Sequence, residues 1–154
     1  MAKERFLDID MEIKFSNRPD IINNIFEKKK LDGEPYQRIP KSVWPIKKNK
    51  KVWFPYIAVI DNETGAWKQQ KENIDWINIP SPDERAITEI PIKTTEKNDY
   101  DPKDEFAVFG CIDEGKDEKY RFYGIYSREQ KENGICIWKR KSPTLDTEEW
   151  KAEE

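Results

Sequence analysis

Apolar and charged residues alternate strictly near the start of the chain. Apolar side chains occupy every second position from Leu7 to Phe15, and the positions between them carry Asp8, Asp10, Glu12 and Lys14. Successive side chains of a strand point to opposite faces, so this pattern predicts one strand with a buried and a solvated face. Such a strand is typical of an antiparallel sheet that covers a core on one side.

A helix is predicted directly after this strand. The stretch Ser16–Asp20 combines helix-capping residues with a proline suited to the first turn. An apolar stripe follows, made of Ile21, Ile22, Ile25 and Phe26. Lys28–Lys30 suits the negative end of a helix dipole and Gly33 marks a stop, so we expect one N-terminal helix that ends before Gly33.

Further apolar runs, separated by turn residues, predict short strands. Lys51–Ile60 has the composition of a central strand with an edge position or bulge at Pro55, and Ala66–Gln70 returns as the second arm of a hairpin. More strands are predicted over Ile74–Ile79, Ala86–Ile92, Phe106–Ile112, Tyr120–Tyr126 and Ile135–Lys141. Ser142–Thr144 and Asp146–Thr147 offer helix caps, and Leu145 and Trp150 are suited to pin a short C-terminal helix, which is therefore predicted. The predicted fold class is α+β: a curled, mostly antiparallel sheet or a small β-barrel with one N-terminal helix and a short C-terminal helix.

Size and composition indicate one folded domain over residues 1–154. Charged residues make up 38% of the chain, but six Trp, six Tyr and seven Phe are too many for a disordered segment. We expect the charged segment 93–105 to be a mobile loop. Because the N-terminus has no apolar signal segment and no run approaches the roughly 18 apolar residues of a membrane span, we expect a cytoplasmic protein without membrane contact. Cys111 and Cys136 fall in apolar runs and are expected to be buried and reduced.

Absent residue types exclude several classes of catalysis. The chain has no histidine, which removes Ser-His-Asp and Cys-His mechanisms and the usual zinc sites. Its six glycines form no phosphate-binding loop. We therefore expect no enzyme activity and no cofactor. The alternative that stays open is a metal-dependent carboxylate enzyme, in which Asp8, Asp10 and Glu12 share one solvated strand face and bind a hard cation such as Mg²⁺.

Charge is distributed unevenly along the chain. Lys28–Lys51 holds eight lysines and one arginine against two acidic residues, whereas 96–119 holds nine acidic residues against four lysines. Within the basic part, Tyr36–Tyr56 interleaves cationic side chains with flat rings. Nucleic-acid sites need this mixture, because cations neutralise phosphates and rings stack on bases at about 1–3 kcal/mol each. We predict that the ligand is stacked by Trp44, Trp53 and Tyr56 and that its phosphates are contacted by Arg38, Lys48 and Lys51.

Core packing is the competing interpretation of the same residues. Trp and Tyr are common in cores, with their polar tips at the surface. Lys47–Lys51 also has the composition of a hairpin turn, where lysines deter aggregation between sheet edges. We expect that at least one or two rings line a pocket among Trp44, Trp53, Trp67, Trp76 and Trp138.

Five short aromatic and basic strings follow one another along the chain: Tyr36–Pro40, Phe54–Tyr56, Phe122–Tyr126, Trp138–Ser142 and Trp150. In this order they resemble small PUA-like modules of the EVE and ASCH type, which include relatives attached to restriction-type nucleases. The resemblance implies a small curved β-barrel with flanking helices that binds RNA, or DNA with modified bases, in an aromatic cleft. The net charge of −3 departs from a typical nucleic-acid binder.

Two kinds of partner follow from these patterns. The leading hypothesis is a non-catalytic binding module that recognises nucleic acid or a nucleotide-like ligand, modified bases included, through the aromatic and basic surface of Tyr36–Tyr56. The alternative is a small protein-binding inhibitor or regulator of phage or mobile-element origin, since a charge-polarised surface steers association with a complementary partner. Under that alternative, Asp99–Glu105 is the contact surface.

Overall fold

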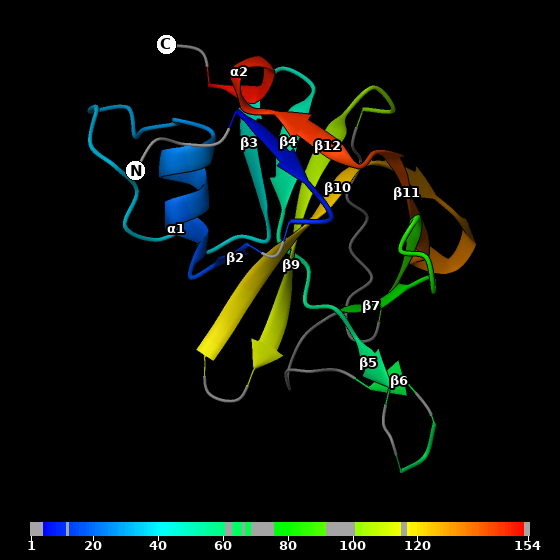
Figure 1. The fold of residues 1–154 in the computed structure, drawn as a ribbon. Helices are drawn as coiled ribbons and strands as arrows, with labels where there is room; N and C mark the ends of the chain where they lie inside the picture. The colour runs from blue at the N-terminus through cyan, green and yellow to red at the C-terminus, as the bar shows by residue number, and fades with distance from the viewer. Residues whose placement is uncertain are drawn as a thin grey trace.

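The chain was analysed as a computed structural model. The structure describes residues 5–11, 13–60, 63–65, 67–68, 76–91, 101–114 and 117–152. Within these ranges the chain is mostly strand, with short helical segments at either end of the sequence (Figure 1). Of the described residues, none belongs to a helix long and apolar enough to cross a membrane.

One large sheet forms the centre of the fold. Its strands follow the order β3 (Val43–Lys47), β4 (Lys50–Trp53), β9 (Glu105–Glu114), β10 (Asp117–Gln130), β11 (Cys136–Ser142), β8 (Ala86–Pro91) and β7 (Trp76–Pro80), and β2 (Lys14–Phe15) pairs with β10. All of these pairs are antiparallel except β4 with β9. The predicted α+β class with a curled, mostly antiparallel sheet is confirmed.

The curl brings edge strand β7 back towards β9. Residues 56–58 lie between them: Tyr56 bridges Cys111 on β9, and Ile57 bridges Asn78 on β7. The approach is close, because a Cβ at Gly110 of β9 would lie 2.8 Å from the side chain of Ile57 and 2.5 Å from that of Tyr123. Strands that are far apart in the sheet order therefore face one another across a narrow interior.

Two apolar clusters fill the fold. The first packs the helical segments against one face of the sheet and includes Ile21, Ile22, Phe26, Phe109 and Trp150. The second lies inside the curl and includes Trp53, Phe106, Tyr123, Tyr126 and Trp138. Figure 1 shows the first helical segment beside β3 and the C-terminal helix near the ends of β3 and β4, so the helices flank only one side of the curled sheet.

The single strand predicted over 7–15 is wrong. The chain forms β1 (Phe6–Asp8), which pairs with β12 (Thr144–Asp146), and then turns before β2. Asp8 makes the turn, because its carboxylate accepts the Asp10 N–H at 2.9 Å and its carbonyl accepts the Met11 N–H at 3.1 Å. The strand face that was to carry Asp8 and Asp10 together does not form, and Glu12 lies outside the described residues.

The predicted N-terminal helix begins as expected but is shorter. Asn17 caps α1 (Arg18–Asp20) by accepting the Asp20 N–H at 2.8 Å, and a π-helical turn, η1 (Ile21–Ile25), follows. The apolar stripe is buried as predicted. The helix ends before the lysines, since Glu27 takes a left-handed conformation with φ of 49°. Asn23 then fixes the returning loop by two hydrogen bonds with the backbone of Tyr36, at 2.7 and 2.8 Å.

The predicted central strand over 51–60 is interrupted. β4 ends at Trp53, just before Pro55, which has no N–H to donate to a ladder. After the bridges at Tyr56 and Ile57, the next strand is β5 (Val59–Ile60), which pairs with β6 (Trp67–Lys68). Strands β7 to β11 agree with the predicted runs, although residues 74–75 and 92–100 and the remainder of the arm predicted over 66–70 lie outside the described residues.

The C-terminal helix, the two cysteines and the segment before β9 were also the subject of expectations from the sequence. Asp146 caps α2 (Thr147–Trp150) by accepting the Glu148 N–H at 3.0 Å, as predicted, and η2 (Glu132–Gly134) joins β10 to β11. Both cysteines are buried free thiols, as predicted. Of the loop predicted over 93–105, the structure describes residues 101–105, where the Asp104 side chain is only 3% exposed and β9 begins at Glu105, and its mobility remains a prediction.

Candidate ligand-binding cavity

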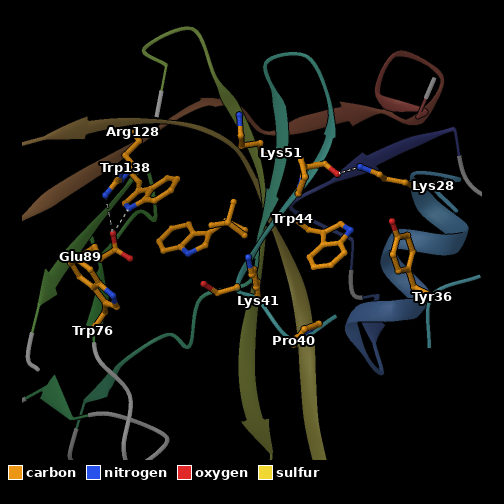
Figure 2. Close-up of a pocket in the computed structure, with 14 residues that line it drawn as sticks. Lys28, Tyr36, Pro40, Lys41, Trp44, Lys51, Trp76, Glu89, Arg128 and Trp138 are labelled. Carbon is orange, nitrogen blue, oxygen red and sulfur yellow. Dashed lines mark hydrogen bonds and ion pairs between the residues drawn. The ribbon is translucent and has the colours of Figure 1, made fainter. Parts of the chain in front are cut away.

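A cavity of about 830 Å³ opens between the β3–β4 hairpin and the strands that curl opposite it. Five of its lining residues are aromatic: Tyr36, Trp44, Trp53, Trp76 and Trp138. An adjoining hollow of about 440 Å³ shares Trp53, Trp76 and Glu89 with it and adds Tyr56 and Asn78. Figure 2 shows Trp76, Glu89, Arg128 and Trp138 on one side of the cavity and Lys28, Tyr36 and Trp44 on the other.

Two stacked indoles form one wall of the cavity. The rings of Trp53 on β4 and Trp138 on β11 lie 3.8 Å apart and are almost parallel, at 12°. Phe106 meets Trp138 edge-on at 4.7 Å. The two tryptophans belong to strands that are not neighbours in the sheet, so the curl is what brings them together. Because both rings are buried, this wall is fixed by core packing.

Glu89 on β8 is a buried carboxyl group in this cavity, with 7% exposure. One carboxylate oxygen accepts the Trp138 indole N–H at 3.3 Å and lies 3.9 Å from Nη2 of Arg128. Burial raises the pKa of Glu89, and the opposing effects of Arg128 and of the indole N–H are smaller. Arg128 is held in turn by Cys136, whose sulfur lies 2.9 Å from the same Nη2.

Asn78 on β7 presents a buried acceptor to the adjoining hollow. Its Nδ2 donates to the Tyr56 carbonyl oxygen at 3.1 Å, and since a carbonyl can only accept, this bond fixes which amide atom is which. Oδ1 is buried, and no donor among the described residues reaches it. Leaving such an atom unsatisfied costs about 1–3 kcal/mol, so a ligand donor would be stabilised there.

The opposite side of the cavity carries donors. Nζ of Lys28 donates to the Pro45 carbonyl oxygen, and burial lowers the pKa of Lys28. The rings of Tyr36 and Trp44 meet edge-to-face at 5.4 Å. Nε1 of Trp44 is buried, and within the described part of the chain it has no acceptor.

The structure brings some of the predicted site residues together and separates others. Trp44, Lys51 and Trp53 line the cavity, and Tyr56 lines the adjoining hollow. Arg38 lines a different hollow, beside Tyr56. Lys48 lines a third, together with Lys28, Lys51 and Asp104. Nζ of Lys51 is only 2.7 Å from the Asp104 carboxylate, so its charge is already matched within the protein. A role for these six residues in ligand binding remains a prediction.

Sequence analysis missed the polar groups of the cavity, although Trp76 and Trp138 were among the rings considered. Asn78, Glu89 and Arg128 lie on strands recognised only by their apolar content. One available signal was strand phase, since Glu89 falls two residues after Ile87 and therefore on the buried face of β8. Four of the five tryptophans that the sequence offered as pocket residues line the cavity, and the side chain of the fifth, Trp67, is not among those that the structure describes.

In the part of the chain that the structure describes, no group of three or more acidic or cysteine side chains is placed to hold a metal ion. A model of one protein family matches residues 1–147; it is described as SRA, the SET and RING associated domain. SRA domains have the PUA-like fold and are non-catalytic modules that read a modified base in DNA. The match confirms the PUA-like part of the resemblance and the predicted class of function; the EVE or ASCH type and a protein partner remain predictions.

A solved structure described as the 5-hydroxymethylcytosine-specific restriction enzyme AbaSI is also similar. The similarity has a TM-score of 0.65 with 23% sequence identity, and it covers 97% of this chain. It covers 44% of the restriction enzyme, so the chain spans less than half of that protein. No curated protein matches the chain. At this identity the similarity supports the fold.

Proposed function

Since the chain belongs to the SRA family, we propose that it binds duplex DNA that carries 5-hydroxymethylcytosine and holds the modified base in the cavity after the base has left the helix. The observation that carries the proposal is a pair of buried acceptors, Asn78 Oδ1 and the Glu89 carboxyl group, within an aromatic enclosure. An enclosure of this kind suits a flipped base, which is stacked on rings and recognised by a few polar groups on its edge.

The two acceptors match the hydrogen-bond donors of cytosine. Its exocyclic amino group has two N–H donors, and a glutamate accepting from that group is a favoured protein–cytosine contact. The Glu89 carboxyl can accept one N–H, while Asn78 Oδ1 lacks a donor in the described chain. Thymine has a carbonyl oxygen where cytosine has this amino group. In thymine a hydrogen-bond acceptor would therefore lie against the two protein acceptors, with no donor from the base between them. The arrangement therefore favours cytosine.

Stacking in the cavity falls mainly to Trp76. Trp53 and Trp138 already stack on each other at 3.8 Å, so no base enters between them. Trp76 is half-buried and lines both the cavity and the adjoining hollow. We infer that the base lies against Trp76, with the paired indoles as the rigid wall behind it. A stacking contact of this kind contributes about 1–3 kcal/mol.

The hydroxymethyl group is the finer part of the proposal. The similar restriction enzyme is described as specific for 5-hydroxymethylcytosine, and its common fold with this chain motivates the same ligand here. A hydroxyl group adds a donor that a methyl group lacks. We propose that this chain supplies recognition only, because the SRA domain is a non-catalytic module.

The test is a binding titration with three duplexes that differ only at one cytosine, which is unmodified, methylated or hydroxymethylated. Fluorescence anisotropy of a labelled duplex gives each dissociation constant. We expect the hydroxymethylated duplex to bind most tightly. Asn78→Ala and Glu89→Gln should each weaken binding of the hydroxymethylated duplex about tenfold, because each removes one contact to the amino group of the base while leaving the phosphate contacts.

Asn24→Ala and Glu129→Gln are the matched controls, since both residues are exposed and neither lines the cavity. They should keep the affinity of the unaltered chain for the hydroxymethylated duplex. Equal affinity of the unaltered chain for all three duplexes would refute the proposed function.

A further inference from the structure

The cavity is chemically divided. One end, the acceptor end, holds Glu89 and the neighbouring Asn78. The other, the donor end, is formed by Lys28, Tyr36 and Trp44 (Figure 2), whereas the acidic residue that lines the cavity, Glu89, lies at the acceptor end. A base amino group suits the first end, but the second requires a ligand that accepts hydrogen bonds.

Two donor groups at this end have fewer hydrogen-bond acceptors among the described residues than they can use. The indole N–H of Trp44 is buried without an acceptor among the described residues. A lysine ammonium has three N–H donors, and for Lys28 the structure gives one acceptor, the Pro45 carbonyl oxygen. Figure 2 shows the nitrogen of Trp44 on the edge of the ring that faces Tyr36, on the same side of the cavity as Lys28. A single acceptor group placed among these three side chains would serve all of them.

We propose that Lys28 and Trp44, with the Tyr36 hydroxyl beside them, form an anion subsite for the backbone phosphate next to the flipped base. The inference rests on the proposed function, because it takes the base to occupy the acceptor end. A phosphodiester has two acceptor oxygens and a negative charge, so it satisfies both the indole N–H and the ammonium. Its charge also offsets the burial that lowers the pKa of Lys28.

The lysines of the nearby hairpin are less suited to this role. Nζ of Lys50 is 2.9 Å from the Glu105 carboxylate, and Nζ of Lys51 is 2.7 Å from that of Asp104. Each would have to leave an acidic partner to bind phosphate. The Lys28 ammonium contacts a neutral carbonyl instead, so a phosphate replaces no ion pair there.

The subsite is tested by combining protein variants with single-phosphate changes in the DNA. Each phosphate near the modified cytosine is replaced in turn by a neutral methylphosphonate, and the dissociation constant is measured by anisotropy. For the unaltered chain, one phosphate adjacent to the modified base should be sensitive, and its neutralisation should weaken binding about tenfold. Lys28→Met should weaken binding of the all-phosphate duplex by a similar factor, and neutralising the same phosphate should then cost less than about twofold more.

Trp44→Phe keeps a ring and removes only the N–H donor. It should lose about threefold to tenfold in affinity and show the same insensitivity to that phosphate. Affinity falls as salt is added, and Lys28→Met should make the negative slope of log affinity against log salt less steep by about one. Thermal unfolding of each variant separates a loss of folding from a loss of contact.

Lys141→Met is the charge-matched control, since Lys141 is exposed and does not line the cavity. For this variant, neutralising the sensitive phosphate should still cost the full factor. If Lys28→Met and neutralisation of the phosphate each weaken binding by their full factor when they are combined, the two groups act independently, and the proposed subsite is overturned. If preference for the modified duplex is intact in that case, only the subsite fails; if the unaltered chain has no such preference, the proposed function fails instead.

Discussion

The wall of the cavity, formed by Trp53 and Trp138 together with Glu89 and the neighbouring Asn78, differs from the basic hairpin beside it in how its polar groups are satisfied. In the wall, Glu89 and Asn78 are buried among apolar rings, and Asn78 Oδ1 has no donor within the described residues. In the hairpin over Lys47–Lys51, charge is abundant, yet Lys50 and Lys51 face Glu105 and Asp104 at 2.9 and 2.7 Å. The wall therefore has fewer charged groups than the hairpin, yet it is the wall that holds a buried acceptor without a donor among the described residues.

This difference bears on how a protein with a net charge of −3 binds DNA. Unpaired surface lysines attract any nucleic acid, because phosphate contacts are independent of sequence. Pairing them with acids lowers that general affinity and leaves discrimination to the buried acceptors. The comparison predicts that changes in the wall alter folding and selectivity strongly, whereas changes in the hairpin alter general affinity weakly.

The largest expected effect is on stability, from Trp138→Ala in the wall. Trp138 is 1% exposed, stacks on Trp53 and donates to Glu89, so truncation leaves a cavity and an unsatisfied carboxyl group. We expect a loss of about 3–5 kcal/mol in the free energy of unfolding. Urea-induced unfolding measures it. Trp44→Ala, at a half-buried position, should lose clearly less, and equal losses would break the comparison.

A smaller effect is expected from the ionisation of Glu89. Burial raises its pKa in the folded chain above the ordinary 4.5, so the protonated form favours folding. That contribution is complete below the ordinary pKa and is lost as pH rises through the raised value. Relative to Glu89→Gln, which cannot ionise, the unaltered chain should lose stability with rising pH above about 4.5. Unfolding curves at several pH values provide the measurement, and a difference that does not vary with pH would show that Glu89 is not desolvated.

The smallest effect should come from the hairpin. Asp104→Asn removes the acidic partner of Lys51, so affinity for unmodified duplex DNA should rise by about twofold to fivefold at low salt. The gain should shrink as salt is added, because it comes from phosphate attraction. Asp32→Asn makes the same change of net charge at an exposed position and should have less effect. If both variants gain equally, net charge explains the result and the pairing does not.

Local pattern was enough for several elements of the fold. Pairs of apolar runs with turn residues between them predicted the strands that became β7 to β11, and the cap at Asp146 predicted α2. The pattern failed where a polar side chain competed with the backbone ladder, as Asp8 does in breaking the predicted first strand. It was incomplete again around Pro55, where an edge position or bulge was expected within one strand, but β4 ends at Trp53 and only single bridges at Tyr56 and Ile57 precede β5.

The candidate site was predictable only in part, for a related reason. The density of rings and cations in Tyr36–Tyr56 pointed to Trp44 and Trp53, and both line the cavity. Lys48 belongs to the same segment but lines a different hollow, since it lies in the turn of the β3–β4 hairpin between the paired Lys47 and Lys50. Asn78 and Glu89 lie 25 or more residues beyond Trp53, and no feature of either strand alone indicates what it faces.

By itself the sequence determined the segments that become β7 to β11, that the cysteines are buried, and that rings and basic residues gather near the β3–β4 hairpin. Tertiary structure alone decided that Trp53 meets Trp138, that Asn78 is joined to Tyr56, and that Lys51 is matched by Asp104. Periodicity reports whether a side chain is buried, since burial depends on the local face of a strand. Which groups meet inside depends on how far the sheet curls, and that is set by pairing between strands distant in sequence.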